Sequence, residues 1–267
     1  MMSSICFNLY PGGRKKALTM SYDDGVIHDR RLVEIFNRYG IRGAFHLNSG
    51  KLDTPGYVSA SEVGRLYAGH EVSVHTVSHP YLGDLPRELI VEEIMADRKA
   101  LEELAGYPVR GMSYPFGTWD DRVVEVLPAC GIEYARTTDS HRGFHIPRDF
   151  LTWGATCHHK FELLDLARQF AAPSHWFRLP LFYVWGHSYE FENDKNWGLI
   201  EEFCKVVSGD DSTWYATNIE IVDYVQAIRR VQSSADGTML RNPSAISVWL
   251  TADGQSREIK PGEILTI

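Results

Sequence analysis

The chain has 267 residues, 44% of them hydrophobic and 23% charged, which excludes a disordered or collagen-like protein. This length is typical of one or two domains, or of a single barrel of alternating strands and helices. The formal net charge is −8 and the longest basic run is the triplet at residues 14–16, so we expect no nucleic-acid partner.

The cysteines and the N-terminus place further limits on the class of protein. The four cysteines are widely spaced and include no C-x-x-C pair, which favours reduced thiols over a disulfide scaffold or a zinc ribbon. The N-terminus lacks a basic start followed by an apolar stretch, and no apolar run is long enough to cross a membrane. We therefore expect a cytoplasmic protein without a membrane partner, although a leader removed from this N-terminus would leave the same pattern.

Short apolar runs alternate with segments of helical periodicity along most of the chain. The apolar runs predict strands at residues 17–22, 43–47, 71–74, 110–114, 133–137, 181–186 and 213–216. The helical segments are expected at residues 29–39, 85–105, 119–130, 161–171, 194–207 and 219–231. A further short helix is expected to begin at residue 61.

This order amounts to about seven units of a strand followed by a helix, which predicts a parallel sheet with right-handed crossovers. Because no glycine-rich nucleotide loop follows a strand, we expect an incomplete (β/α)7 barrel over residues 1–232 rather than an open, doubly wound sheet. Residues 233–267 differ in character, with alternating residues at 245–251, a hairpin signal at Asp253-Gly254 and an extended stretch at 258–267. They are predicted to form a small, β-rich C-terminal appendage.

Polar residues gather at the predicted carboxyl ends of the barrel strands, where barrels of this kind keep their active sites. These residues are Asp23, Asp24, His75, Tyr114, Pro115, Arg136 and His187. Their agreement in position is the main indication of an active site.

Two of these segments carry residues that bind metal ions. Adjacent residues of a strand point to opposite sides, so one of Asp23 and Asp24 could bind a metal while the other acts as a base. His75 and His79 lie four residues apart, and on a helical turn both imidazoles reach one ion. One carboxylate and two imidazoles make a catalytic metal site with open positions for water and substrate. The alternatives are a capped Asp-Gly turn and two structural histidines.

Two other segments could take part in catalysis. The turn at residues 113–117 could direct backbone N–H groups at a developing oxyanion, although an ordinary turn has the same sequence. His187 ends a predicted strand and could donate a proton, or could be a hydrogen-bonded structural residue. Cys157, His158 and His159 are too close in sequence to bind one ion with relaxed geometry, so a second metal site or a substrate-pocket histidine remains a weaker interpretation.

Taken together, residues 19–25, 69–82, 111–117 and 180–188 resemble the successive motifs of the polysaccharide deacetylase family, carbohydrate esterase family four. The motif Thr-Phe-Asp-Asp-Gly appears as Ser21-Tyr-Asp-Asp-Gly25, and His-(Ser/Thr)-x-x-His is matched in full by residues 75–79. The resemblance spans roughly residues 15–230 and leaves the β appendage outside it.

The resemblance implies an incomplete barrel and a divalent ion, most readily zinc, held by Asp24, His75 and His79. It implies that Asp23 is the general base and that His187 protonates the leaving amine. The backbone N–H of Phe116 would help to hold the oxyanion.

The sequence departs from the family pattern at two places. The third motif usually begins with an arginine, which is Ser113 here, and we hypothesise that Arg136 supplies the missing charge. The Asp-x-x-Asp-Trp motif is not found, so the partner of His187 is unassigned.

The residues predicted to contact the substrate are Tyr114, Pro115 and Trp185.

Three functions remain open at this point. The first is a metal-dependent hydrolase that removes acetyl groups from N-acetylated or O-acetylated saccharides. The second is a C–N hydrolase acting on a non-sugar amide such as a cyclic ureide. The third is a catalytically silent carbohydrate-binding protein. The oligomeric state is not predicted.

Overall fold

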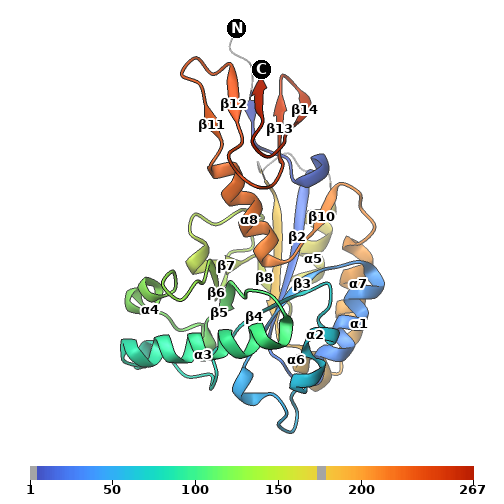
Figure 1. Cartoon of the computed structure of the whole chain (residues 1–267). Coiled ribbons are helices and arrows are strands. Elements are labelled where there is room, and N and C mark those ends of the chain that lie inside the picture. Colours follow the sequence, from blue (N-terminus) through green and yellow to red (C-terminus); the bar gives the residue numbers. More distant parts are fainter. Residues whose placement is uncertain (1–4, 173–178) are drawn as a thin grey trace.

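A curved parallel sheet forms the centre of the computed structural model, which describes residues 5–172 and 179–267 (Figure 1). The strand order is β7-β6-β5-β4-β3-β2-β9-β8, and β10 pairs with the first half of β2. The strands are β2 (Lys16–Asp24), β3 (Gly43–Leu47), β4 (Glu71–Val74), β5 (Gly111–Ser113), β6 (Tyr134–Ser140), β7 (Trp153–Ala155), β8 (Cys157–His158), β9 (Leu181–Gly186) and β10 (Thr213–Tyr215).

The two end strands of this sheet, β7 and β8, are consecutive along the chain with only Thr156 between them. The Thr156 N–H donates to the carbonyl of Tyr183 in β9 at 2.8 Å, and its carbonyl accepts from the N–H of Arg142, just after β6, at 2.8 Å. One extended segment thus contacts both sides of the sheet, which curls into the predicted incomplete barrel.

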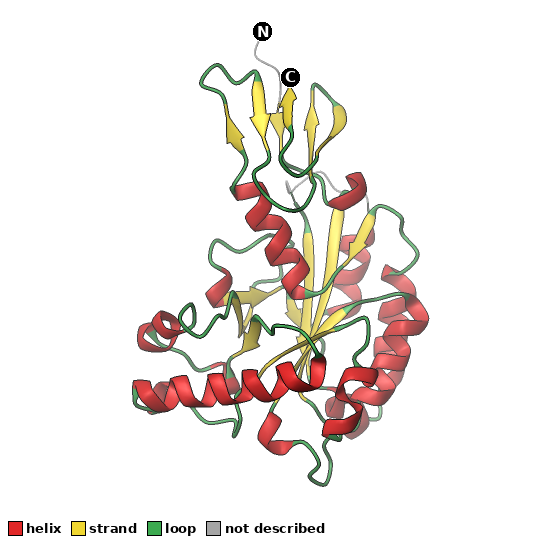
Figure 2. Cartoon of the chain, in the orientation of Figure 1, coloured by secondary structure: helices red, strands yellow, loops and turns green. Residues whose placement is uncertain are grey.

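The helices lie around the outside of the barrel (Figure 2). They are α1 (Asp29–Tyr39), α2 (Val63–Leu66), α3 (Arg87–Ala105), α4 (Asp121–Val126), α5 (Leu163–Ala171), α6 (Ser188–Asn193), α7 (Trp197–Val207) and α8 (Asn218–Arg229). Helix α1 shows why such segments are helical: Leu32, Ile35 and Phe36 are buried on one face, and Gly40 ends the helix with a φ of 66°. The sequence predicts the bounds of α1 correctly.

The carboxyl half of β2 has one apolar and one polar face. Along β2, Leu18, Met20 and Tyr22 pack into the core beneath the helices, while the intervening Ser21 and Asp23 face the barrel interior. The interior therefore holds a hydrogen-bonded polar network beside a buried, largely aromatic cluster that includes Tyr134, Trp153 and Tyr183.

The network continues on the neighbouring strands. The hydroxyl of Tyr134 donates to the carboxylate of Glu71 at 2.7 Å and lies 2.8 Å from the Ser73 hydroxyl. A Cβ at Gly111 would lie 2.2 Å from the Tyr134 ring, so only glycine leaves room for that ring inside the barrel. These buried hydrogen bonds join the first residues of β4 and β6, below the candidate site.

Two small antiparallel sheets stand at the end of the barrel where β2 begins, away from the carboxyl ends of the strands (Figure 1). One comprises β1 (Ile5–Cys6), β13 (Val248–Ala252) and β14 (Gln255–Ile259), and the other β11 (Gln232–Ser233), β12 (Met239–Arg241) and β15 (Ile264–Thr266). The predicted hairpin at Asp253-Gly254 joins β13 to β14, and both residues have positive φ. The division after residue 232 stays a prediction, and β1 adds an N-terminal strand to this end.

Two differences from the sequence prediction concern residues of the candidate site. The helix expected at 194–207 is preceded by a separate short helix, α6, which begins directly after His187. Arg136 is the third residue of β6 and fully buried, whereas the sequence analysis placed it at a strand end.

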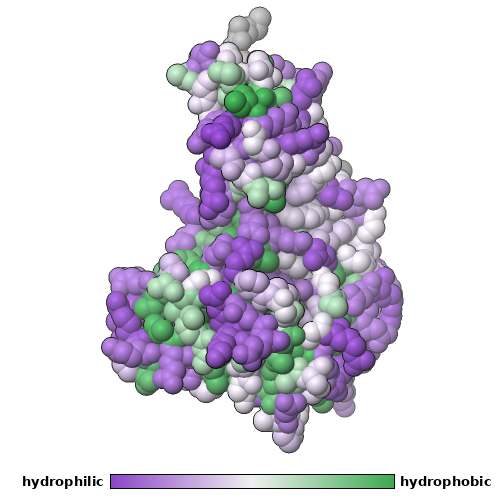
Figure 3. All heavy atoms as spheres, viewed as in Figure 1, coloured by the Kyte–Doolittle hydropathy of each residue, from purple (hydrophilic) through white to green (hydrophobic). Residues whose placement is uncertain are grey.

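Other general properties of the chain agree with its composition. All four cysteines are free thiols, as predicted. None of the helices in the described part of the chain has the length and apolar character needed to span a membrane. The face shown in Figure 3 is largely hydrophilic, with hydrophobic residues scattered over it.

Candidate active site

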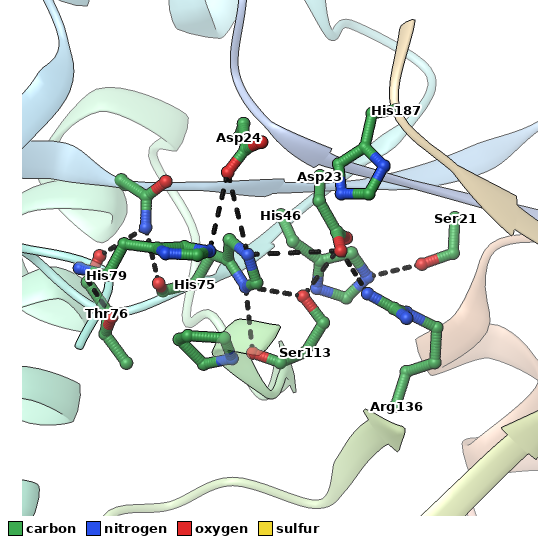
Figure 4. A network of polar contacts seen from close by, with 12 residues as sticks. Ser21, Asp23, Asp24, His46, His75, Thr76, His79, Ser113, Arg136 and His187 are labelled. Carbon is green, nitrogen blue, oxygen red and sulfur yellow. Dashed lines mark hydrogen bonds and ion pairs between the residues drawn. The ribbon is translucent and has the colours of Figure 1, made fainter. Parts of the chain in front are cut away.

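A cluster of polar side chains lies where the carboxyl ends of β2, β4, β5 and β9 meet (Figure 4). Asp23 and Asp24 end β2, His75 follows β4, and His187 follows β9. Since all these strands are parallel, their carboxyl ends share one edge of the barrel, and residues far apart in sequence meet there.

Asp24, His75 and His79 bring three ligand atoms together. Oδ1 of Asp24 lies 3.8 Å from Nε2 of His75 and 3.7 Å from Nε2 of His79, and all three atoms lie within 4.8 Å of one another. These separations are too long for hydrogen bonds. Oδ1 of Asp24 is also buried, and no hydrogen-bond partner for it occurs among the described residues. A carboxylate oxygen and two imidazole nitrogens that converge without bonding one another fit a divalent cation.

Ser113 orients the imidazole of His75. Nδ1 of His75 lies 2.7 Å from the Ser113 hydroxyl and 2.9 Å from its carbonyl oxygen, so this nitrogen carries the proton and Nε2 keeps its lone pair. Burial lowers the pKa of His75 to about 3, so the ring is neutral at physiological pH. His75 is therefore held in the form that binds metal ions.

Asp23 is held in its ionised form by a buried arginine. Its Oδ2 forms an ion pair with Arg136, and its Oδ1 accepts a hydrogen bond from the Ser113 hydroxyl at 3.1 Å. The guanidinium of Arg136 in turn lies over the ring of Trp185, 4.2 Å from its centroid. Burial alone would raise the pKa of Asp23, but the charge of Arg136 and the nearby His75 hold it well below its usual range.

Glu190 is the partner of His187, for which the family motifs in the sequence provide none. Its Oε2 lies 3.2 Å from Nδ1 of His187 and accepts from the His187 backbone N–H at 3.1 Å, as in a capping box of α6. Burial would lower the pKa of His187, but the bond to Glu190 and the charges of Asp23 and Asp24 raise it above its ordinary value. The spacing of three residues between His187 and Glu190 was the sequence signal that could have revealed this pair.

The carboxylate of Glu190 also lies close to His158 and His159, the two histidines that follow Cys157 in the sequence. Oε2 of Glu190 lies 3.1 Å from Nε2 of His158 and 3.4 Å from Nε2 of His159. Its other oxygen lies 3.2 Å from the ammonium of Lys160. Glu190 thus lies close to three imidazoles and one ammonium, and with His158 and His159 it makes a second group that could hold a metal ion, which does not include Cys157.

Four non-glycine residues of the site have backbone angles in the left-handed region. Asp24, Thr76, His79 and Phe116 all have positive φ, with values of 79°, 66°, 60° and 56°. Non-glycine residues in this region carry a cost of about 1–3 kcal/mol each and are typical of functional sites. The strained backbone directs the side chains of Asp24 and His79 into the metal-type cluster.

The three residues predicted to contact the substrate are mostly buried. Tyr114 is 1% exposed and its hydroxyl donates to the carbonyl of Leu151 at 2.7 Å, Pro115 is buried, and Trp185 is 8% exposed beneath Arg136. Their substrate-binding role stays a prediction, and their burial weighs against it. The exposed aromatic side chain of this turn is Phe116, which is 51% exposed.

Known proteins resemble part of this chain in sequence. Residues 11–135 match the family model for polysaccharide deacetylase, which confirms the resemblance seen in the sequence motifs. Chitin deacetylase 1 of Cryptococcus neoformans is 29% identical over 120 residues, which cover 44% of this chain and 25% of that protein. The peptidoglycan-N-acetylglucosamine deacetylase PgdA of Listeria monocytogenes is 24% identical over 127 residues, which cover 46% of this chain and 26% of that protein. The matches thus span about a quarter of the length of these relatives.

A solved structure extends the likeness in fold to most of the chain. A Mycobacterium smegmatis protein assigned to the polysaccharide deacetylases aligns with a TM-score of 0.64 and 16% sequence identity. The alignment covers 86% of this chain and 96% of that one. At this identity the likeness concerns the fold, and it agrees with the incomplete barrel described above.

Proposed function

Since residues 11–135 match polysaccharide deacetylases, we propose that this chain is a metal-dependent hydrolase that removes acetyl groups from N-acetylated or O-acetylated saccharides. The observation that carries the proposal is the meeting of Asp24, His75 and His79 with an ionised Asp23 and a His187 of raised pKa at one end of the barrel. An acid, a base and a metal-type ligand set are what hydrolysis of an amide or ester requires.

Asp24, His75 and His79 would hold the divalent ion, with zinc as the best match to two imidazoles and one carboxylate. When bound, such an ion polarises a carbonyl and makes water more acidic. Ser113 supports this role because it fixes the tautomer of His75.

Asp23 is the proposed general base and takes a proton from the attacking water. Arg136 keeps it ionised, and the hydroxyl of Ser113 bonds its second oxygen, so that the carboxylate has one orientation. Arg136 thereby supplies the positive charge that the family pattern places at the position of Ser113.

The backbone N–H of Phe116 is proposed to donate to the oxyanion that forms when water adds to the acetyl carbonyl. His187 then protonates the leaving nitrogen or oxygen, and Glu190 holds the ring in place through Nδ1. The lowered pKa of Asp23 and the raised pKa of His187 support the base and acid roles proposed for them.

Acetate release from N-acetyl chito-oligosaccharides, measured with and without added zinc, tests this function. We expect metal-dependent release that Asp23→Asn abolishes. Hydrolysis of a cyclic ureide without acetate release from any acetylated saccharide would favour the alternative C–N hydrolase. Saccharide binding without either reaction would favour a silent binding protein.

A further inference from the structure

Two exposed aromatic rings stand beside the candidate metal ligands. Tyr81 and Phe116 are 50% and 51% exposed, and their rings stack with centroids 4.0 Å apart and an angle of 8° between planes. Among the exposed large apolar side chains in the described ranges, these are the two whose rings contact each other. Two stacked aromatic rings that are half exposed beside a cluster of polar side chains are typical of a ligand contact.

The pair is continuous with the candidate active site. The ring of Phe116 lies 4.4 Å from that of His79, at 72°. Tyr81 comes from the loop that follows His79, whereas Phe116 comes from the turn after β5. One ring thus comes from the loop of the proposed metal ligand His79, and the other belongs to the proposed oxyanion donor Phe116. Together the two rings form one exposed aromatic surface beside the site.

The backbone of Phe116 holds its ring at this surface. Its φ of 56° is in the left-handed region, which a non-glycine residue adopts at a cost. The following Gly117 also has positive φ, and a Cβ there would lie 2.2 Å from the Thr138 hydroxyl oxygen. Close packing against Thr138 therefore fixes the turn at Phe116 and Gly117, and this backbone conformation holds the Phe116 ring in its exposed position.

We propose that Tyr81 and Phe116 form a substrate subsite that binds a pyranose ring of the saccharide by stacking, a role that rests on the proposed function. The C–H groups on one face of a pyranose are weakly positive, and the face of an aromatic ring is weakly negative. A sugar that is bound there lies next to His79, so that an acetyl group it carries, or one on its neighbour, is close to the candidate metal site. The subsite selects for a saccharide over a small acyl compound.

The test compares the wild-type chain with Tyr81→Ala, Tyr81→Phe and Met95→Ala in acetate release from N-acetyl chitotetraose. Tyr81→Ala should raise KM about five- to tenfold, the size of effect typical of one stacking contact, while kcat and zinc content stay near wild type. Tyr81→Phe should restore the wild-type KM because it keeps the ring. Met95→Ala removes another exposed apolar side chain, on α3, and should leave KM unchanged.

Two results would overturn the inference. An unchanged KM in Tyr81→Ala shows that no sugar stacks there, and a joint loss of zinc and thermal stability shows that the two rings only clamp the loops together. If the wild-type chain releases no acetate, the same variants are compared by the dissociation constant for N-acetyl chitotetraose after zinc is removed with EDTA. A weaker constant in Tyr81→Ala then supports the subsite even though the proposed activity fails, whereas equal constants, or no binding by the wild-type chain, refute it.

Discussion

The pairing of Arg136 with Asp23 gives the sharpest prediction for the proposed mechanism. Arg136 is fully buried and Asp23 is 2% exposed, so replacing Arg136 with methionine leaves a carboxylate with no cationic partner at that position. Arg136→Lys keeps the positive charge but lacks the planar donor geometry of the guanidinium. The two variants separate the effect of charge from the effect of shape.

The size of the effect follows from the burial of both groups. Removal of one partner of a buried ion pair costs about 3–5 kcal/mol, because the other charge is left uncompensated. Burial then dominates the pKa of Asp23 and raises it, so the carboxyl group is protonated over more of the neutral range. Since a general base contributes roughly 10²–10⁴-fold to a rate, we expect kcat of Arg136→Met at pH 7 to fall at least about 100-fold.

The assay is acetate release from N-acetyl chito-oligosaccharides between pH 5 and pH 9 on the zinc-loaded chain (on the order of four pH units, enough to follow a shifted carboxyl group). For Arg136→Met, the acid limb of the pH profile of kcat should move to higher pH, and activity should recover in part as the pH rises. Arg136→Lys should lie between this variant and wild type. Arg110→Met is the matched control, because Arg110 pairs with Asp223 and Glu133 on the partly exposed surface.

The reasoning would be refuted if Arg136→Met had the turnover and acid limb of wild type while Asp23→Asn abolished activity. Asp23 would then act as a base without help from Arg136. Urea unfolding of each variant, measured in parallel, separates a loss of stability from a loss of catalysis.

Three further predictions concern residues around this pair. Glu190→Gln removes the bond that raises the pKa of His187, so the alkaline limb of the pH–rate profile should shift to lower pH, and an unmoved limb would exclude Glu190 as its partner. Ser113→Ala should weaken zinc binding about tenfold in calorimetric titration because it frees Nδ1 of His75 from one of its two oxygen contacts, and an unchanged affinity would exclude this support. Burial raises the pKa of Asp29 to about 7, so the folded chain keeps this proton where the unfolded chain loses it, and stability falls as the pH rises from about 4 to about 7. Asp29→Asn should remove up to about 4 kcal/mol of that decline in urea unfolding, and an identical pH dependence in both chains would contradict it.

The sequence predicted the elements whose period and ends are marked locally. Residues 29–39 and 181–186 have clear helical and apolar patterns, and the structure has α1 and β9 with these bounds. The helix expected at 119–130 ends at Val126, two residues before Pro128, whose ring disfavours a continued helix. The segment 153–158 was missed because its two short strands are defined by pairing with β6 and β9, which depends on closure of the barrel.

The candidate site was predicted in part for a similar reason. Asp24, His75 and His79 are recognisable because their spacing and their position after strands are visible in the sequence. Glu190 and Tyr81 were missed because their roles come from contacts and exposure: one bonds His187 across a capping box, and the other stacks on Phe116 from a separate loop. The stacking of Tyr81 on Phe116 depends on where two loops meet, which no local pattern specifies. The spacing of His187 and Glu190 is visible in the sequence, but it does not show that the side chains bond.

The most direct measurement is the zinc content of the purified chain, taken together with acetate release from N-acetyl chito-oligosaccharides on the same sample. We predict one tightly bound ion per chain and zinc-dependent release, both lost in His79→Ala. Both should be retained in His145→Ala, which removes an exposed histidine outside the cluster. A wild-type chain that binds no divalent ion, or a His79→Ala variant that keeps both the ion and the activity, would contradict the account.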